Sequence, residues 1–257
     1  LQLVPISATA FDIVPQALEQ AKSLGAEPAA SAKAVAQRST LIDVVVRTDQ
    51  EVLDCTLGDE GIFAGAAPGT LVLLHSTIRP TTTKQVAQAA ADKRVYVIDA
   101  CMTGVPSVAR DGGLTFLVGG QKALFNRAKP HLLSMSKDAV YMGPLGSGNV
   151  TKLIKNLVTA SEALIIYEAI QIGKAAGIDY RAALELMKKT QSEPFLNRWE
   201  DKFDLSGPEL KFNSGANLYD KDLPLAADVG KALGADIPVT EELAKLGIRL
   251  SGGKLGV

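Results

Sequence analysis

The chain of 257 residues has only two cysteines, few aromatic residues and almost no net charge. The cysteines, Cys55 and Cys101, are too few for a disulfide framework, so we expect reduced thiols and a cytoplasmic protein. Aromatic residues make up 5% of the chain and the formal net charge is −1, whereas a nucleic-acid binder needs a basic face and usually stacking rings. No apolar run reaches the roughly 18 to 20 residues that span a bilayer. We therefore expect neither nucleic acid nor membrane as a partner.

The first residues also lack the marks of a targeting signal. Residues 1–5 contain no basic stretch and no cleavage site of a signal peptide. There is no initiator methionine, so we expect the sequence to begin inside a longer natural protein. Hydrophobic residues make up 47% of the chain and charged residues 21%, which excludes a disordered chain because such a composition can bury enough apolar surface to fold. The length suits one or two domains.

Six short stretches in the first half are rich in β-branched and aliphatic residues. They lie at 7–11, 42–46, 70–74, 95–98, 114–118 and 139–142. Stretches of helical composition lie between several of them, at 15–24, 31–37 and 80–91. Continuous runs of Val, Leu and Ile suit strands covered on both faces, and strand–helix alternation indicates a parallel sheet with right-handed crossovers. The pattern predicts a Rossmann-type, doubly wound α/β domain.

The pattern becomes helical after the glycine-rich segment 143–148. Residues 149–176 contain no proline, and their apolar residues recur at helical spacing. About 28 helical residues form a rod of roughly 40 Å, long enough to leave one domain and found the next. Further helices are predicted at 180–190, 195–203, 218–233 and 240–250. We expect a dinucleotide-binding domain at 1–147, followed by an all-α substrate and dimerisation domain at 148–257.

Asp12 is the first candidate site residue. It follows an extended stretch and precedes a helix that begins with Pro15. In a dinucleotide-binding fold, an acid at the end of the second strand binds the ribose hydroxyls, and the glycine-rich turn lies about 20 residues upstream. Only eleven residues precede Asp12 here, so that turn would fall before residue 1. The alternative is a plain acid at a helix N-terminus, and Asp12 alone does not exclude it.

Lys152 and Asn156 lie four residues apart on the predicted long helix and share one face of it. Asn149 and Thr151 are candidate capping residues, which would place Lys152 in the first turn. A lysine there opposes the helix macrodipole, a placement that favours the neutral amine and suits a general acid or base. The alternative is a solvated lysine beside Lys155.

Two segments at predicted strand ends could bind a ligand. Residues 99–105 follow the fourth predicted strand, and Thr103 with the amide of Gly104 could donate hydrogen bonds to a carboxylate. A tight turn is the alternative. Ser76 and Thr77 follow the strand before it, and they could equally cap the helix at Pro80. The glycines at 146–148 and 252–253 match no complete phosphate-binding motif and suit hinges and turns.

Four motifs, in this order along the chain, resemble those of the β-hydroxyacid dehydrogenase family, which includes 3-hydroxyisobutyrate dehydrogenase and, more distantly, 6-phosphogluconate dehydrogenase. Ser-Thr at 76–77 resembles the S-T after its fourth strand. D-A-C-M-T-G-V at 99–105, continuing to G-L-T at 113–115, is similar to its substrate motif D-A-P-V-S-G-G…G-x-L-T. Residues 146–156 resemble its catalytic motif G-x-G-x-x-x-K-x-x-N-N, and K-D-L at 221–223 resembles a motif of its helical domain.

The resemblance implies a role for each candidate. Lys152 corresponds to the catalytic acid/base and Asn156 to a substrate-binding residue beside it. Thr103 and Gly104 correspond to residues that hold the substrate carboxylate, and Thr77 and Lys221 to residues that contact the nicotinamide cofactor. Asp12 aligns with the acid after the second strand, which implies NAD rather than NADP because a 2′-phosphate would meet a negative charge there.

The sequence also departs from the family pattern. Cys101 replaces a proline, Thr103 a serine and Val105 the second glycine, while Lys155 replaces the first asparagine of the N-N pair. Thr103 keeps a hydroxyl, but its methyl group and Val105 narrow the pocket. Lys155 adds a positive charge that favours an acidic substrate. The first strand, the glycine turn and the last helices of the family pattern are not seen in this sequence.

These residues together predict an oxidoreductase that transfers hydride between NAD and a small 3-hydroxy acid such as 3-hydroxyisobutyrate, serine or threonate, without a metal. The alternatives are a small aldehyde or keto-acid reductase of the same family, a decarboxylating enzyme of the 6-phosphogluconate type, or a non-catalytic scaffold that has lost the cofactor turn. The resemblance further implies a homodimer or homotetramer.

Overall fold

The computed structural model describes residues 8–190, 203–204, 211–212 and 218–250. The chain divides into two compact units, Leu1–Lys152 and Leu153–Val257. The long helix α8, Ser147–Ala175, begins in the first unit and continues into the second. The predicted boundary at 147–148 falls at the start of this helix, and the two units divide five residues further on.

The first unit contains a five-stranded sheet in the order β3-β4-β5-β6-β7. Its strands are β3 Leu41–Val44, β4 Leu71–Leu74, β5 Tyr96–Thr103, β6 Leu114–Gly119 and β7 Ser136–Gly143. A separate parallel pair is formed by β1, Thr9–Ala10, and β2, Glu27–Pro28. All six predicted strand stretches coincide with strands within the described residues, and the α/β class is confirmed.

The direction of β6 differs from the expected parallel arrangement. Strands β3, β4 and β5 are mutually parallel, but β6 is antiparallel to β5, and β7 is parallel to β6. Ten residues join β5 to β6, and they contain only the short helix α6, Pro106–Arg110. A parallel crossover needs about a dozen residues or more. The short connection therefore returns the chain antiparallel.

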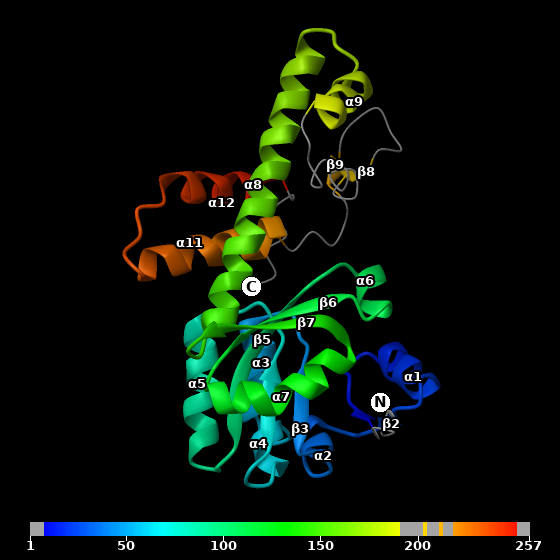
Figure 1. The fold of residues 1–257 in the computed structure, drawn as a ribbon, viewed down its shortest axis with the longest axis vertical. Coiled ribbons are helices and arrows are strands. Elements are labelled where there is room, and N and C mark those ends of the chain that lie inside the picture. Colours follow the sequence, from blue (N-terminus) through cyan, green and yellow to red (C-terminus); the bar gives the residue numbers. More distant parts are fainter. Residues whose placement is uncertain (1–7, 191–202, 205–210, 213–217, 251–257) are drawn as a thin grey trace. The chain divides into compact units, whose positions relative to one another are not determined.

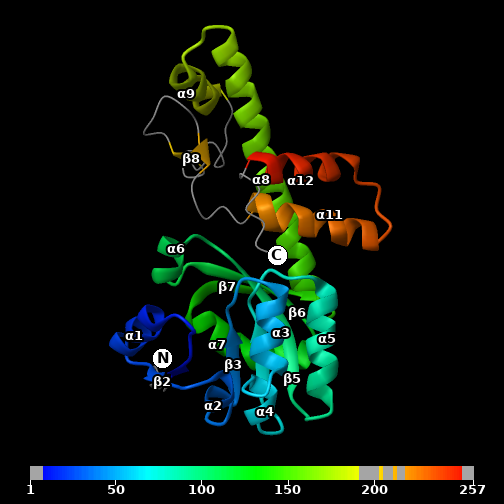
Figure 2. The ribbon, with the colours of Figure 1, turned by 180° about the vertical axis from the view of Figure 1, so that it is seen from behind.

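Helices cover both faces of this sheet. They are α2 Ala32–Ala36, α3 Asp49–Leu57, α4 Ile62–Gly65, α5 Pro80–Ala91 and α7 Lys122–Ser134. Helix α1, Pro15–Ser23, packs instead with β1 and β2. Helix α7 lies in front of the sheet in Figure 1, and α3 lies in front of it in the opposite view of Figure 2. Helices α3, α4 and α7 are absent from the sequence prediction. Helix α3 had a detectable signal, because Thr48 and Glu51 form a capping box at its start.

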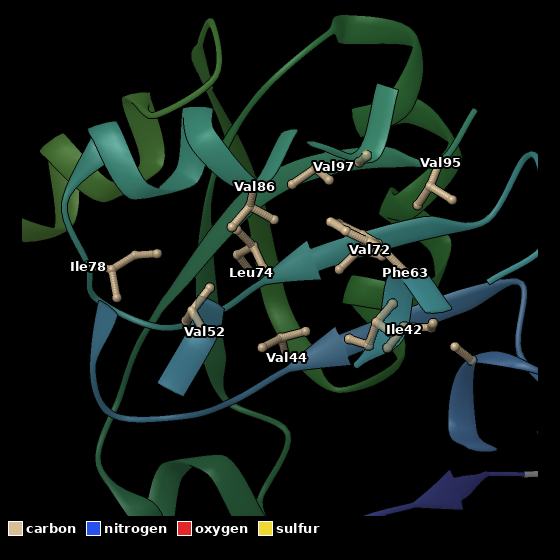
Figure 3. Close-up of a cluster of buried hydrophobic side chains, with 13 residues drawn as sticks. Ile42, Val44, Val52, Phe63, Val72, Leu74, Ile78, Val86, Val95 and Val97 are labelled. Carbon is tan, nitrogen blue, oxygen red and sulfur yellow. The ribbon is translucent and has the colours of Figure 1, made fainter. Parts of the chain in front are cut away.

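Alternate residues of β4 pack into two different cores. Val72 and Leu74 belong to a cluster with residues of α3, α4 and α5, which Figure 3 shows. Leu71 and Leu73 point to the other face and pack with residues of α7, β5 and β6. Side chains alternate between the faces of a strand, so a run of four aliphatic residues is explained by burial on both sides.

The second unit is mainly helical within the described residues. It contains the remainder of α8, α9 Tyr180–Thr190, the π-helix η2 Leu218–Asp222, α11 Leu223–Ala232 and α12 Pro238–Leu250. The predicted helix at 195–203 lies outside the described residues except for Phe203. That residue belongs to β8, Phe203–Asp204, which pairs with β9, Lys211–Phe212.

Helix α8 has 29 residues and a length of about 43 Å. In the second unit, its buried side chains Ala160, Ala163 and Leu164 pack with residues of η2 and α11. The neighbouring Ile165 is 63% exposed. No helix in the described part of the chain has the length and hydropathy needed to cross a membrane.

Candidate functional site

The buried carboxylate of Asp99, in β5, holds the start of α8. Asp99 Oδ1 accepts a hydrogen bond from the Gly146 amide at 2.7 Å, and Oδ2 accepts one from the Asn149 amide at 2.9 Å. The first amides of a helix have no partner within the helix, and negative charge is favourable there. Burial raises the pKa of Asp99, although the amide hydrogen bonds act in the opposite direction. The start of α8 is thus capped from a strand rather than by its own side chains.

The glycines around this carboxylate are required by its close approach. A Cβ atom on Gly148 would lie 2.7 Å from Asp99 Oδ2, and one on Gly119 would lie 2.5 Å from Oδ1. Gly146 has a φ of +95°, which L side chains rarely adopt. The segment Gly-Ser-Gly at 146–148 therefore serves to dock a helix end onto β5.

Asn149 adds a second connection through its fully buried side chain. Its Nδ2 donates to the Ser76 carbonyl oxygen and to Cys101 Sγ, both at 3.1 Å. Its Oδ1 accepts from Thr83 Oγ1 at 2.8 Å. One amide group thereby joins the first turn of α8 to α5 and to the carboxyl-terminal parts of β4 and β5. Both cysteines are free thiols, and Cys101 is the buried one.

Ser76 and Thr77 lie just beyond the end of β4. Ser76 Oγ accepts a hydrogen bond from the Val46 amide at 3.0 Å, which fixes the segment after β3 against the segment after β4. The N-cap residue of α5 is Arg79. Its amide donates to Asp49 Oδ1 at 3.0 Å. Thr77 is half-buried beside the anchored Ser76.

Thr103 and Gly104 lie where β5 ends. Thr103 is half-buried and faces Thr115 of β6 in the antiparallel register. Gly104 has a φ of +145°, and a Cβ atom there would lie 2.7 Å from Leu114 Cδ2. The glycine is therefore needed for both its backbone conformation and its close packing. Thr103, Thr77 and the anchored start of α8 all lie toward the carboxyl-terminal side of β4 and β5.

Lys152 lies in the second turn of α8 and not in the first, because the helix begins at Ser147. The expected capping role of Asn149 and Thr151 is wrong. Thr151 Oγ1 donates to the Ser147 carbonyl oxygen at 2.8 Å within the helix, and the Asn149 side chain binds the strand segments. Since the macrodipole effect falls off within about one turn, it gives little support for a neutral amine at Lys152.

Asn156, Asp222 and Lys221 form a cluster in the second unit. Asn156 Nδ2 donates to Asp222 Oδ2 at 2.7 Å, and Lys221 Nζ lies 3.4 Å from Asp222 Oδ1. Asn156 and Asp222 are both buried. The structure thus brings two predicted site residues onto one carboxylate. Asp222 was not singled out from the sequence, although it is the acid of the K-D-L motif.

Asp12 is exposed and follows β1 by two residues. Its Oδ1 accepts from the amide of Val14, the N-cap residue of α1, at 2.8 Å. Asp12 therefore has the role that the sequence left open as the alternative, that of an acid at the N-terminus of a helix. The other carboxylate oxygen has no hydrogen-bond partner among the residues that the structure describes, so it can accept a ligand hydroxyl.

The only two histidines of the chain bind one carboxylate. His75 Nε2 and His131 Nε2 each lie 2.7 Å from an oxygen of Asp43. His75 Nδ1 lies 2.7 Å from the Ala100 carbonyl oxygen. Burial by itself would raise the pKa of Asp43, but the hydrogen bonds with His131 and His75 outweigh it and hold the pKa well below its ordinary value. Within the described ranges, no cluster of three or more His, Cys, Asp or Glu residues is arranged to hold a metal ion.

Two protein families match consecutive parts of the chain. Residues 5–143 match the family described as the NAD binding domain of 6-phosphogluconate dehydrogenase. Residues 146–254 match the family described as NAD-binding of NADP-dependent 3-hydroxyisobutyrate dehydrogenase. The point where one match gives way to the other, between 143 and 146, lies immediately before α8.

Two similar proteins and one similar structure are named as dehydrogenases of serine or 3-hydroxyisobutyrate. The NAD-dependent L-serine dehydrogenase of Pseudomonas aeruginosa is 30% identical over 235 residues, covering 89% of this chain and 79% of that protein. A probable mitochondrial 3-hydroxyisobutyrate dehydrogenase of Dictyostelium discoideum is 31% identical, covering 87% and 72%. The structure of Mycobacterium tuberculosis 3-hydroxyisobutyrate dehydrogenase with L-serine is 24% identical, with a TM-score of 0.80 and coverage of 95% and 85%. This last likeness shows the fold.

Proposed function

The chain belongs to the β-hydroxyacid dehydrogenase family, and on that premise we propose that it transfers hydride between NAD and a small 3-hydroxy acid, with Lys152 as the general acid and base. The observation that carries this proposal is the anchoring of α8. Asp99 and Asn149 fix its first turn at the carboxyl-terminal side of β4 and β5, where open α/β sheets bind ligands. Lys152 follows three residues later.

Lys152 exchanges a proton with the substrate oxygen. In the oxidising direction its neutral amine accepts the proton of the hydroxyl group, while hydride leaves the carbon that bears this group. In the reducing direction the ammonium returns the proton to the carbonyl oxygen as hydride arrives. NAD, when bound, supplies the hydride acceptor, and NADH the donor. Proton transfer from a positioned side chain contributes about 100- to 10,000-fold in rate.

Thr103, Gly104 and Asn156 orient the substrate. The Thr103 hydroxyl and the Gly104 amide bind its carboxylate. Asn156 Nδ2 donates to the buried Asp222, which fixes the orientation of the amide and leaves Oδ1 as the acceptor for a hydroxyl or an ammonium group. Holding reactants in one geometry removes much of the entropic barrier to reaction.

Asp12, Thr77 and Lys221 are the proposed cofactor contacts. The exposed oxygen of Asp12 suits a ribose hydroxyl, and its negative charge disfavours the 2′-phosphate of NADP. Thr77 is held beside the anchored Ser76, and Lys221 is oriented by its ion pair with Asp222. The residues present thus fit NAD, and NADP is the less favoured cofactor.

Reduction of a small aldehyde or keto acid is the same chemistry in reverse, with Lys152 as the acid. We place the enzyme in the cytoplasm and infer a homodimer or homotetramer. Helix α8 supports the inference of an oligomer because three exposed apolar residues, Ile154, Val158 and Ile165, recur along it at helical spacing.

The test replaces Lys152 by alanine and measures turnover of L-serine, 3-hydroxyisobutyrate and threonate with NAD. Turnover should fall by about 100-fold or more, while NADH fluorescence titration should give an unchanged affinity. The exposed Lys137, in β7, provides the matched control, and Lys137→Ala should keep full activity. Full activity of Lys152→Ala would exclude the proposed chemistry. A wild-type protein without turnover or NADH binding would favour the non-catalytic scaffold.

A further inference from the structure

We propose that Asn149 is a positioning residue for Lys152, and that its side chain sets the rotation of α8 about the helix axis. This inference rests on the proposed function. Asn149 precedes Lys152 by three residues, so the two lie on neighbouring positions of the helix surface. Both belong to the first compact unit, as do all the partners of the Asn149 side chain.

The two anchors of α8 restrain different motions. Asp99 binds the amides of Gly146 and Asn149, which point along the helix axis at its start. An anchor at the end of a helix fixes its position along the axis but resists rotation about the axis weakly. The Asn149 side chain leaves the helix sideways and binds Ser76, Cys101 and Thr83. A lateral anchor resists rotation.

Small rotations of α8 are large displacements at the tip of a lysine. With side chains, a helix has a radius of about 5 to 6 Å, so a rotation of about 10° moves a side-chain tip by about 1 Å. A displacement of about 1 Å in an active site can cost about 100-fold in rate. The rotational setting of α8 therefore matters for proton transfer by Lys152.

The partners of Asn149 are the neighbours of the other proposed contacts. Ser76 directly precedes Thr77, the proposed nicotinamide contact. Cys101 lies two residues before Thr103, the proposed carboxylate contact, and Cys101 Sγ donates to the Ser76 carbonyl oxygen at 3.3 Å. The buried side-chain amide of Asn149 thus connects the segment that precedes Thr77, the strand that carries Thr103 and the helix that carries Lys152.

The experiment compares Asn149→Ala with Thr83→Val and Thr56→Val. Thr83→Val removes only the partner of Asn149 Oδ1. Thr56 is equally buried but bonds to the Val52 carbonyl oxygen within α3, so Thr56→Val measures the effect of a lost buried hydrogen bond elsewhere in the same unit. For each variant, kcat, KM, the melting temperature, the NADH affinity and the kinetic isotope effect with substrate deuterated at the carbinol carbon are measured.

We expect kcat of Asn149→Ala to fall by about 10- to 100-fold, with NADH affinity and KM changed by less than about threefold. The isotope effect should rise because hydride and proton transfer become rate-limiting. Thr83→Val should show the same changes at smaller size. Thr56→Val should lower the melting temperature alone. Active sites are counted by NADH titration, so a partly unfolded preparation does not imitate a fall in kcat.

Wild-type kcat and isotope effect in both Asn149→Ala and Thr83→Val would overturn the positioning role while leaving the proposed function intact. If Asn149→Ala does not fold, Thr83→Val decides by itself: a normal isotope effect contradicts the inference. Absence of wild-type turnover, or full activity of Lys152→Ala, would instead contradict the proposed function.

Discussion

Asn156 and Asp222, 66 residues apart in the sequence, form a buried hydrogen bond of 2.7 Å between an amide and a carboxylate. The carboxylate joins the long helix α8 to the π-helix η2, which carries Lys221. A carboxylate without a proton only accepts hydrogen bonds, so it is the Nδ2 group of the Asn156 amide, and not Oδ1, that binds Asp222. The orientation of a proposed substrate contact is therefore set by Asp222.

Replacing Asp222 by asparagine keeps the size of the side chain but removes its charge. Hydrogen bonds to charged groups contribute about 1.5–3 kcal/mol, so we expect kcat/KM for the hydroxy acid to fall by about 10- to 100-fold, with a smaller effect on NADH binding. Steady-state kinetics and NADH titration measure both. The exposed Asp236 offers the control Asp236→Asn, which should change neither. Equal losses of kcat/KM in Asp222→Asn and Asp236→Asn would mean that the loss of negative charge, and not the orientation of Asn156, causes the effect.

Asp43 links stability to pH. The pKa of this carboxyl group is lowered in the folded protein, so its stabilising effect is present above the unfolded-state pKa of about 4 and is lost as the pH falls toward the folded-state pKa. Asp43→Asn should therefore unfold more easily at pH 7, by about 1–3 kcal/mol. The difference from wild type should shrink progressively below about pH 4. Urea unfolding at a series of pH values measures it. Asp92→Asn, on the surface at the end of α5, should show no such trend, and a difference independent of pH would refute the assignment.

Asp12 should select between the two nicotinamide cofactors. Asp12→Ala removes the acceptor for the ribose hydroxyls and the charge that repels a 2′-phosphate. We expect the ratio of kcat/KM for NAD to that for NADP to fall by about tenfold or more, since about 1.4 kcal/mol corresponds to tenfold. Glu19→Ala, which removes an exposed acid from α1, should leave the ratio unchanged. If both variants keep the wild-type ratio, the ribose is bound elsewhere.

Lys155 should influence which acids are accepted. It is exposed, and it lies three residues after Lys152 on α8, so the two amines occupy neighbouring surface positions. Lys155→Asn should lower kcat/KM for a hydroxy acid with a second carboxylate by about two- to fivefold and have less effect on L-serine. The effect should decrease with added salt. Lys129→Asn, on α7, provides a charge-matched control. An equal effect on both substrates would exclude selection by charge.

Local patterns in the sequence predicted many of the elements because each depends on neighbouring residues. The helix at 80–91 begins with a proline, whose fixed φ suits the first turn, and its predicted bounds match those of α5. The run at 70–74 was predicted as a strand covered on both faces, and all four residues of β4 are buried. Helices α3, α4, α6 and α7 were missed. The four or five residues of α4 and α6 show little periodicity, whereas the equally short α2 was predicted at 31–37.

The α/β class, the change to helices after residue 148 and the position of Lys152 and Asn156 on one helix follow from the order of the amino acids. The antiparallel direction of β6, the capping of α8 by Asp99 and the orientation of Asn156 by Asp222 follow only from the packed fold. Helix and strand periodicity is written in residues that are close along the chain, whereas a buried carboxylate finds its donors across 47 to 66 residues, and its partners are fixed only when the elements that carry them have packed.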